Sequence, residues 1–136
     1  MTDDELTHLL RGRGSPALTT IGGEVLGYDQ ARREVTMRFL ATPGMCHSEV
    51  IVQGGFITAM VDSAMAYAAM GACEGRAAVP TLEVKVSFLR AGNPGPMLGR
   101  GRVVRLGKSI GFLEGDLHQN DVLVATASST IRLIYR

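Results

Sequence analysis

Tryptophan is absent from this 136-residue chain, and other aromatic residues are few, with three tyrosines and four phenylalanines. Cysteine is also scarce: only Cys46 and Cys73 occur, at a spacing that fits no zinc motif. The formal net charge is +1, and no basic stripe interleaved with aromatic residues is present. These shortages argue against a nucleic-acid-binding surface, a disulfide framework and a metal site.

The sequence also shows no targeting segment. Residues Met1–Glu5 are acidic and lack the basic start and apolar core of a signal peptide, which predicts a cytoplasmic protein. The apolar run Val50–Cys73 raises the question of a membrane helix, but Gln53, two glycines and Asp62 interrupt it. Hydrophobic residues make up 46% of the chain and charged residues 20%, as is typical of a globular protein. We expect a single domain over residues 1–136, with no membrane or nucleic-acid partner.

The segment Gln53–Gly71 predicts one long helix. Apolar residues recur along it at the helical three-and-four spacing, at Ile57, Met60, Val61, Ala64 and Ala68. The other faces are scarcely more polar, and a helix that is apolar all round is buried all round. Its one formal charge is Asp62, and a buried carboxylate is costly without a partner. Asp62 is therefore either satisfied locally by hydroxyl or backbone groups, or it has a chemical function.

The entrance to this helix favours the functional interpretation of Asp62. Gln53-Gly54-Gly55 places two residues without side chains where free N–H groups and the positive end of the helix dipole converge. Such an entrance suits an anion or a polarised carbonyl group. A glycine pair alone is weak evidence, since Gln53 could simply cap the helix, but the pair together with Asp62 two turns later predicts a site.

Strands are expected on both sides of the central helix. Residues 2–12 predict a short first helix with the capping box Thr2–Glu5. The predicted strands cover residues 18–28, 33–40, 82–88, 98–106, 110–118 and 123–135. Consecutive strands joined by tight turns form a mostly antiparallel sheet. We therefore predict an α+β fold with one antiparallel sheet wrapped around the long helix, completed by a dimer that continues the sheet.

This arrangement resembles the hotdog-fold acyl-CoA thioesterases, and more narrowly their phenylacetic-acid-degradation (PaaI-like) branch. The resemblance extends from about Ile21 to the C-terminus. The family pattern is His-Gly-Gly with an Asp or Glu nine residues after the His; here Gln53 replaces that His, and Asp62 keeps the spacing. The family often has Asn or Gln six residues before the His, where this chain has His47. Thr81, Phe88–Ala91 and the turn at residues 107–109 also match.

The resemblance implies a role for each matching residue. The Gly54 N–H would polarise the thioester carbonyl and hold the oxyanion. Asp62, reaching in from the other subunit, would act as general base or nucleophile, and Thr81 would position the water. His47 and Gln53 would line the thioester end, although Gln53 cannot shuttle a proton, and the sequence does not decide whether His47 takes over that role.

The same resemblance implies where coenzyme A would bind. Its phosphates need cations and N–H groups near the pocket mouth. The candidates are Gly55, Arg90, Arg105, Lys108 and Ser109. Arg90, Arg105 and Lys108 could each equally be an ordinary solvated surface charge. The implied enzyme uses no metal or bound cofactor, has coenzyme A as part of its substrate, and is a homodimer or a homotetramer made of two dimers.

Three functions remain open at this level. The first is hydrolysis of a medium-chain or aryl acyl-CoA; the second is a non-catalytic acyl-CoA-binding protein; the third is a hotdog dehydratase, which would normally need a His at the helix entrance. The sequence does not identify the acyl chain, nor does it distinguish free coenzyme A from a carrier protein. Five large residues of the helix could line an adaptable acyl pocket or serve as core: Phe56, Met60, Met65, Tyr67 and Met70.

Overall fold

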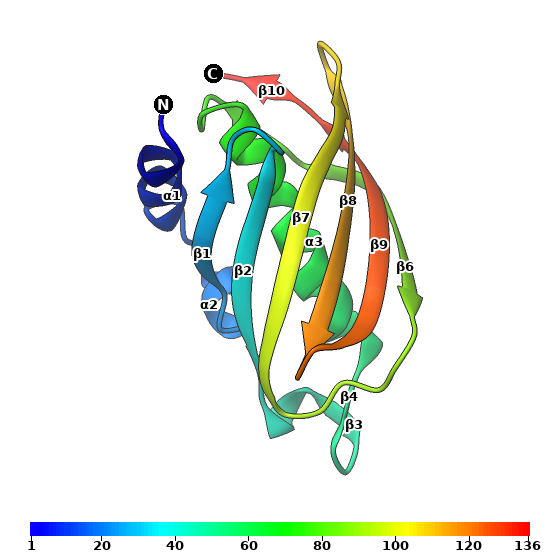
Figure 1. Ribbon diagram of the computed structural model, residues 1–136. Coiled ribbons are helices and arrows are strands. Elements are labelled where there is room, and N and C mark those ends of the chain that lie inside the picture. Colours follow the sequence, from blue (N-terminus) through cyan, green and yellow to red (C-terminus); the bar gives the residue numbers. More distant parts are fainter.

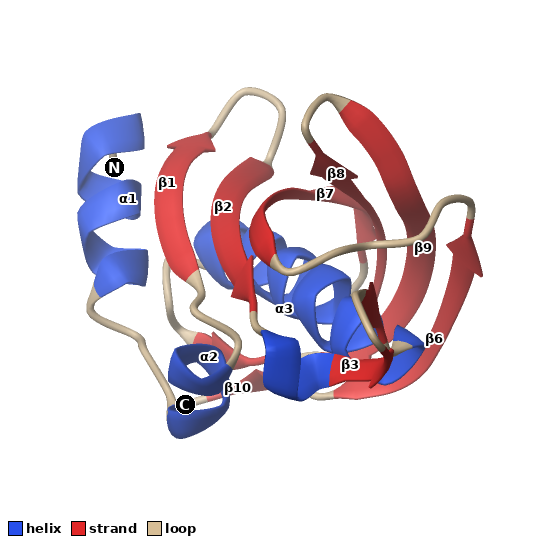
Figure 2. Ribbon diagram, turned by 90° about the horizontal axis from the view of Figure 1, so that it is seen from below, coloured by secondary structure: helices blue, strands red, loops and turns tan.

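Six antiparallel strands form one sheet in the order β1-β2-β7-β8-β9-β6 in the computed structural model, which describes residues 1–136 (Figure 1). Their bounds are β1 Glu24–Asp29, β2 Glu34–Ala41, β6 Thr81–Phe88, β7 Gly95–Leu106, β8 Ile110–Gln119 and β9 Val122–Arg132. The sheet curves around the long helix α3, Gly54–Ala72 (Figure 2). The predicted antiparallel sheet around one central helix is confirmed.

Smaller elements surround this core. They are α1 (Asp3–Arg11), α2 (Pro16–Thr20), the 3-10 turn η1 (Pro43–Met45), β3 (Cys46–Ser48), β4 (Ile51–Val52), β5 (Ala77–Ala78) and β10 (Ile134–Tyr135). The helix α1 lies outside β1, at one edge of the sheet (Figure 2). Its predicted capping box is confirmed, because the Thr2 hydroxyl accepts from the Glu5 N–H at 3.1 Å and the Glu5 carboxylate accepts from the Thr2 N–H at 2.8 Å.

The predicted strand over residues 18–28 is wrong in its first half. The chain forms the short helix α2 there, because Ser15 caps it and Pro16 occupies its first turn. The Ser15 hydroxyl accepts from the Leu18 N–H at 3.1 Å. A serine followed by proline is a helix-start signal, and here it overrides the strand prediction.

Two further predictions about the strands need correction. The last strand does not run to residue 135 as predicted; β9 ends at Arg132, and Tyr135 belongs to β10, where it is exposed. In β6 the apolar residues stand at alternate positions from Leu82 to Phe88, which predicts one buried face, but Leu82 and Phe88 are 56% and 54% exposed. The register of β6 shifts between Thr81 and Glu83, and this strand has a neighbour on one side only. An edge strand leaves such side chains uncovered within a single chain.

Glycines on the inner face of the sheet let α3 approach it closely. A Cβ atom at Gly101 would lie 2.1 Å from the Ala64 carbonyl oxygen, and one at Gly115 would lie 2.9 Å from Met65 Cγ. On the same side of the helix, Met65 and Ala64 are fully buried. This contact fixes the helix against β7 and β8.

The opposite side of α3 is not covered by the sheet, so the helix is not buried all round as its composition predicts. Its half-buried residues include Thr58, Ala59, Asp62, Ser63 and Ala66. The apolar stripe from Ile57 to Ala68 lies on the buried side. The other faces are nearly as apolar, so the composition of the helix gave no sign that one of them stays open. No helix of the structure is long and apolar enough to cross a membrane.

Candidate active site

A cavity of about 450 Å³ lies beside the start of α3, between the β3–β4 hairpin and the segment that leaves β6. Gly54, the first residue of the helix, is part of its wall. The apolar lining consists of Ile51, Val52, Ile57, Phe88, Leu89 and Ala91. Its two ionisable lining residues are His47 and Arg90. The cavity thus combines an apolar wall with a helix N-terminus.

Backbone bonds hold the helix entrance in place. The Val52 N–H donates to the Gly92 carbonyl, and the Gln53 N–H donates to the Met45 carbonyl, both at 2.9 Å. The Gln53 carbonyl in turn accepts from the N–H groups of Phe56 and Ile57. The N–H groups before them, at the very start of the helix, have no carbonyl one turn back to bond. They remain available to polarise a ligand in the cavity.

Gly54 lies in close contact with an aromatic ring. A Cβ there would lie 3.0 Å from Cζ of Phe88, so the ring of that residue rests against the glycine. A Cβ at Gly55 would instead meet Oε1 of Gln53 at 3.0 Å, the end of a flexible and exposed side chain. The two glycines therefore face different surroundings, and Gly54 is the one that faces the cavity.

His47 and Gln53 differ in their relation to the cavity. His47 lines it, and its Nδ1 lies 2.6 Å from the Ser48 hydroxyl. Gln53 does not line it; its side chain lies over Gly55 and makes no capping hydrogen bond. Of the two residues predicted near the thioester end, only His47 therefore lines the cavity.

Asp62 and Thr81 are brought together within one chain. The Thr81 hydroxyl donates to Oδ1 of Asp62 at 2.9 Å, linking the middle of α3 to the start of β6. This is the only hydrogen bond to the Asp62 side chain, and no ion pair reaches it. The second carboxylate oxygen is left free. Thr81 was predicted to position water; here it orients the carboxylate.

The surroundings of Asp62 shift its ionisation. Burial raises the pKa of its carboxyl above the ordinary value, because desolvation disfavours the charged form. The hydrogen bond from Thr81 lowers the pKa and offsets part of that rise. Burial is the larger of the two effects, so the pKa stays above the ordinary value. A carboxylate with a raised pKa accepts a proton more readily, as a general base requires.

Asp62 and Gly54 of the same chain are too far apart to act on one carbonyl group. Eight residues of α-helix separate them, which corresponds to about 12 Å along the axis. Asp62 lies on the side of α3 that the sheet leaves uncovered, next to the edge strand β6. Both halves of the predicted chemistry can meet only if a second copy contributes one of them.

The predicted coenzyme A residues fall into two groups. Arg90 lines the cavity near Gly54. Lys108 and Ser109 lie in the β7–β8 turn at the opposite end of the sheet from that cavity, and Arg105 lies in the strand leading to this turn (Figure 1). One chain therefore does not bring Lys108, Ser109 or Arg105 to the cavity that contains Arg90.

The large residues of α3 do not form the cavity. Met60 and Met65 are fully buried and Tyr67 is 6% exposed, all within the core. Phe56 and Met70 pack against that core at its margin. The apolar lining near Gly54 comes instead from β4 and from Phe88–Ala91, which the sequence marked only as a familiar segment. No group of three or more His, Cys, Asp or Glu side chains is placed to hold a metal ion.

Comparison with known proteins identifies the family of the chain. The family model described as "Thioesterase superfamily" matches residues 49–126, a range that includes the helix entrance, Asp62 and Thr81. No curated protein matches the chain. Among solved structures, a thioesterase from Ralstonia eutropha, named as related to phenylacetic acid degradation, is 32% identical. The alignment covers 94% of this chain and 98% of that one, with a TM-score of 0.85.

Two more distant structures share the fold. The Escherichia coli PaaI protein from the phenylacetic acid degradation operon is 20% identical over 95% of this chain and 96% of its own, with a TM-score of 0.81. A hypothetical thioesterase from Streptococcus pneumoniae, solved with coenzyme A, is 16% identical over 84% of this chain and 87% of its own, with a TM-score of 0.74.

Proposed function

Because the chain belongs to the thioesterase superfamily, in its phenylacetic-acid-degradation branch with the hotdog fold, we propose that it hydrolyses acyl-CoA thioesters at a site shared by two copies. The observation that carries the proposal is the position of Gly54. This residue has no side chain, begins α3 and forms part of the wall of an apolar cavity. The coenzyme A bound to the pneumococcal structure supports the choice of the acyl carrier.

In this mechanism the thioester carbonyl binds at the start of α3. The Gly54 N–H and the helix dipole stabilise the oxyanion that forms when the carbonyl carbon is attacked. The acyl group lies against the apolar wall, which accommodates a medium-chain or aryl group, and His47 hydrogen-bonds near the thioester end. Arg90 meets the coenzyme A moiety at the mouth. The helix entrance thus supplies electrophilic assistance and no proton.

Asp62 of the second copy supplies the base. Its free carboxylate oxygen takes a proton from a water molecule whose oxygen attacks the carbonyl carbon, or it attacks that carbon itself and forms a mixed anhydride that water then hydrolyses. On either route the C–S bond breaks, and coenzyme A leaves as a thiolate that takes up a proton. The Thr81 hydroxyl donates to the other carboxylate oxygen throughout. No metal or bound cofactor takes part. Lys108 and Ser109 of the second copy, on a turn remote from their own chain's cavity, are proposed to bind the coenzyme A phosphates.

A homodimer is proposed as the smallest active form, and a pair of dimers as the fuller assembly. The strand β6 has an unpaired edge, and the exposed side chains of Leu82 and Phe88 lie on it. Pairing of β6 with β6 of a second copy would continue the sheet and cover this apolar surface.

The test is thiol release from a panel of short, medium, long and aryl acyl-CoAs. We expect Asp62→Asn to lower kcat/KM by a factor on the order of 10²–10⁴, because a general base or nucleophile is lost. The matched control is Ser63→Ala, the next residue on the half-buried side of the same helix, which should keep its activity. Coenzyme A binding by Asp62→Asn, measured by calorimetry, should be unchanged.

Three results would contradict the proposal. Wild-type protein that binds coenzyme A but hydrolyses no member of the panel would indicate the non-catalytic binding function. Activity that survives in Asp62→Asn would remove Asp62 from the mechanism. Hydration of an enoyl-CoA, assayed in parallel, would indicate a dehydratase instead.

A further inference from the structure

The two edges of the sheet differ in whether another element covers them. The edge strand β6 has no neighbour on its outer side, whereas the other edge strand, β1, lies beside α1. An unpaired strand edge presents free N–H and C=O groups that can pair with another chain. Whether the β1 edge can pair in this way depends on how α1 contacts the backbone of β1.

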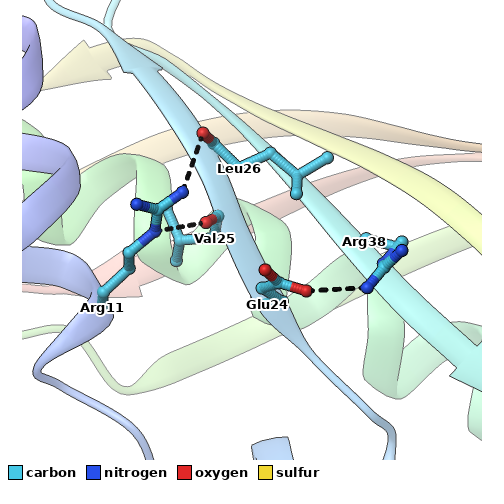
Figure 3. Close-up of polar contacts among 5 residues, drawn as sticks. All are labelled: Arg11, Glu24, Val25, Leu26 and Arg38. Carbon is cyan, nitrogen blue, oxygen red and sulfur yellow. Dashed lines mark hydrogen bonds and ion pairs between the residues drawn. The ribbon is translucent and has the colours of Figure 1, made fainter.

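Polar side chains of α1 take the place of a neighbouring strand. The Arg11 Nε donates to the Val25 carbonyl at 2.9 Å, and its Nη2 donates to the Leu26 carbonyl at 3.4 Å (Figure 3). The Thr7 hydroxyl accepts from the Tyr28 N–H at 3.0 Å. These bonds occupy both carbonyl and N–H groups along the outer side of β1.

A third residue of α1 extends the same row. Asp3 Oδ1 accepts from the Gln30 N–H at 2.9 Å, just beyond the end of β1. Asp3, Thr7 and Arg11 are spaced by four residues, so they share one face of the helix. Four residues of helix rise about 6 Å, close to the roughly 6.6 Å covered by two residues of strand. The side chains therefore keep step with the backbone groups they satisfy.

Packing holds this row in place. Leu6 and Leu10, on the neighbouring face of α1, are each 1% exposed and belong to the main core. The capping box at Thr2 and Glu5 fixes where the helix begins. The helix cannot slide along β1 without losing both the apolar contact and the row of hydrogen bonds.

We propose that α1 is an assembly stop: it closes the β1 edge, so that the sheet can be continued only at β6, by β6 of a second copy. If both edges were open, β1 of one copy could pair with β6 of the next, a head-to-tail contact that generates open filaments. With β1 closed, only β6 paired with itself remains, and a two-fold contact of that kind ends at two chains.

The charges on β6 favour pairing with β6 of a second copy. Glu83 and Lys85 are exposed and stand two residues apart on the outer face of the strand, with Val84 between them on the inner face. Antiparallel self-pairing centred on Val84 places each Glu83 opposite Lys85 of the other copy, and opposite charges across a strand pair are stabilising. The inference rests on the proposed function in one respect, namely that a second copy occupies β6.

The test is the double variant Arg11→Ala/Thr7→Val, which removes the bonds to β1 and leaves Leu6 and Leu10 in place. We expect its weight-average mass in sedimentation to rise by about twofold or more over an approximately tenfold increase in concentration, while wild type keeps a fixed mass. His8→Ala, an exposed residue of α1 with no bond to β1, is the matched control and should behave as wild type. Adding Leu26→Lys to the double variant should restore the wild-type mass, since a lysine on an edge strand disfavours pairing.

Hydrogen exchange separates the outcomes. In the double variant the Tyr28 amide should lose protection, because its acceptor is gone. A bare β1 edge with an unchanged mass would overturn the proposal, as would larger assemblies that Leu26→Lys fails to reverse, since those would reflect general unfolding. Thioester hydrolysis, measured on the same samples, tests the proposed function separately, because α1 contributes nothing to the cavity.

Discussion

The two sides of α3 differ in almost every physical respect. The side facing the sheet is packed without clearance: the backbone of Ala64 lies where any side chain at Gly101 would have to go. The other side carries Gly54 at its entrance and Asp62 in its middle, and the sheet leaves it half-covered. One helix therefore serves as the core of the domain along one side and as the proposed active site along the other.

This difference explains how a small domain can hold a partly buried carboxylate in place. Asp62 receives a single hydrogen bond, from Thr81, so its own contacts fix only one of its oxygens. The position of the helix is set by the glycine contacts at β7 and β8. A rigid element positions catalytic groups more accurately than a loop does. The close packing on the sheet side is what gives the open side its geometry.

The largest expected effect follows from adding one methyl group to the packed side. A Cβ at position 101 would lie 2.1 Å from the Ala64 carbonyl oxygen and 2.6 Å from the Met65 nitrogen, and neither backbone can move freely. We expect Gly101→Ala to lower the free energy of unfolding by about 3 kcal/mol or more. Urea denaturation followed by circular dichroism would measure the loss.

Gly27→Ala is the matched control for this substitution. Gly27 is also a strand glycine, and a Cβ there would meet nothing within 4 Å. Its free energy of unfolding should change by no more than about 0.5 kcal/mol. Equal stabilities for the two variants would show that the helix has room to move away from β7, and the contrast between its two sides would fail.

Local patterns in the sequence were sufficient to predict the central helix and its entrance. The glycine pair, the apolar run and the lone charge of Asp62 are all read within one continuous segment. The pairing of Asp62 with Thr81 was not predictable in this way, because the two lie 19 positions apart on different elements. They come together only because the start of β6 packs beside the middle of α3.

Side-chain orientation was the other unpredictable quantity. The sequence gives His47 and Gln53 equal claims to the thioester end, yet only His47 lines the cavity. The difference arises from the β3–β4 hairpin, whose bonds to Met45 and Gly92 set the direction of the chain into α3. The bond from Val52 reaches Gly92, far along the chain, and no spacing rule within the motif encodes it.

A smaller effect is expected at the helix entrance, where two adjacent glycines can be compared. In Gly54→Ala the added methyl group would press on the Phe88 ring and narrow the cavity, so we expect kcat/KM to fall on the order of tenfold. In Gly55→Ala the methyl group meets only the exposed Gln53 side chain, and activity should be retained. Thiol-release kinetics on both variants would measure the difference. Equal losses would indicate that the glycines serve helix geometry alone, and that Gly54 has no particular relation to the substrate.

The smallest effect concerns the stability of the open side as a function of pH. Burial raises the pKa of Asp62 in the folded chain, so between the ordinary aspartate pKa and this higher value the folded state binds more protons than the unfolded state. The free energy of unfolding therefore falls as pH rises through that window, and it remains lower above it. An asparagine at this position has no charge to desolvate. Asp62→Asn should thus gain in Tm relative to wild type as pH rises from acidic to neutral, by about a few degrees at most.

Thr81→Val sharpens this comparison from the other direction. The valine has no hydroxyl group, so the variant lacks the hydrogen bond that favours the ionised carboxylate. The pKa of Asp62 should therefore rise further, and the decline in Tm towards neutral pH should steepen. Ser63→Ala, beside Asp62 on the same helix, changes no ionisable group, and its Tm difference from wild type should be the same at every pH. If the gap between Asp62→Asn and wild type instead narrowed with rising pH, the ionised carboxylate would be stabilising the fold. Asp62 would then be a structural partner of Thr81, and the open side of α3 would differ from the packed side only in its exposure.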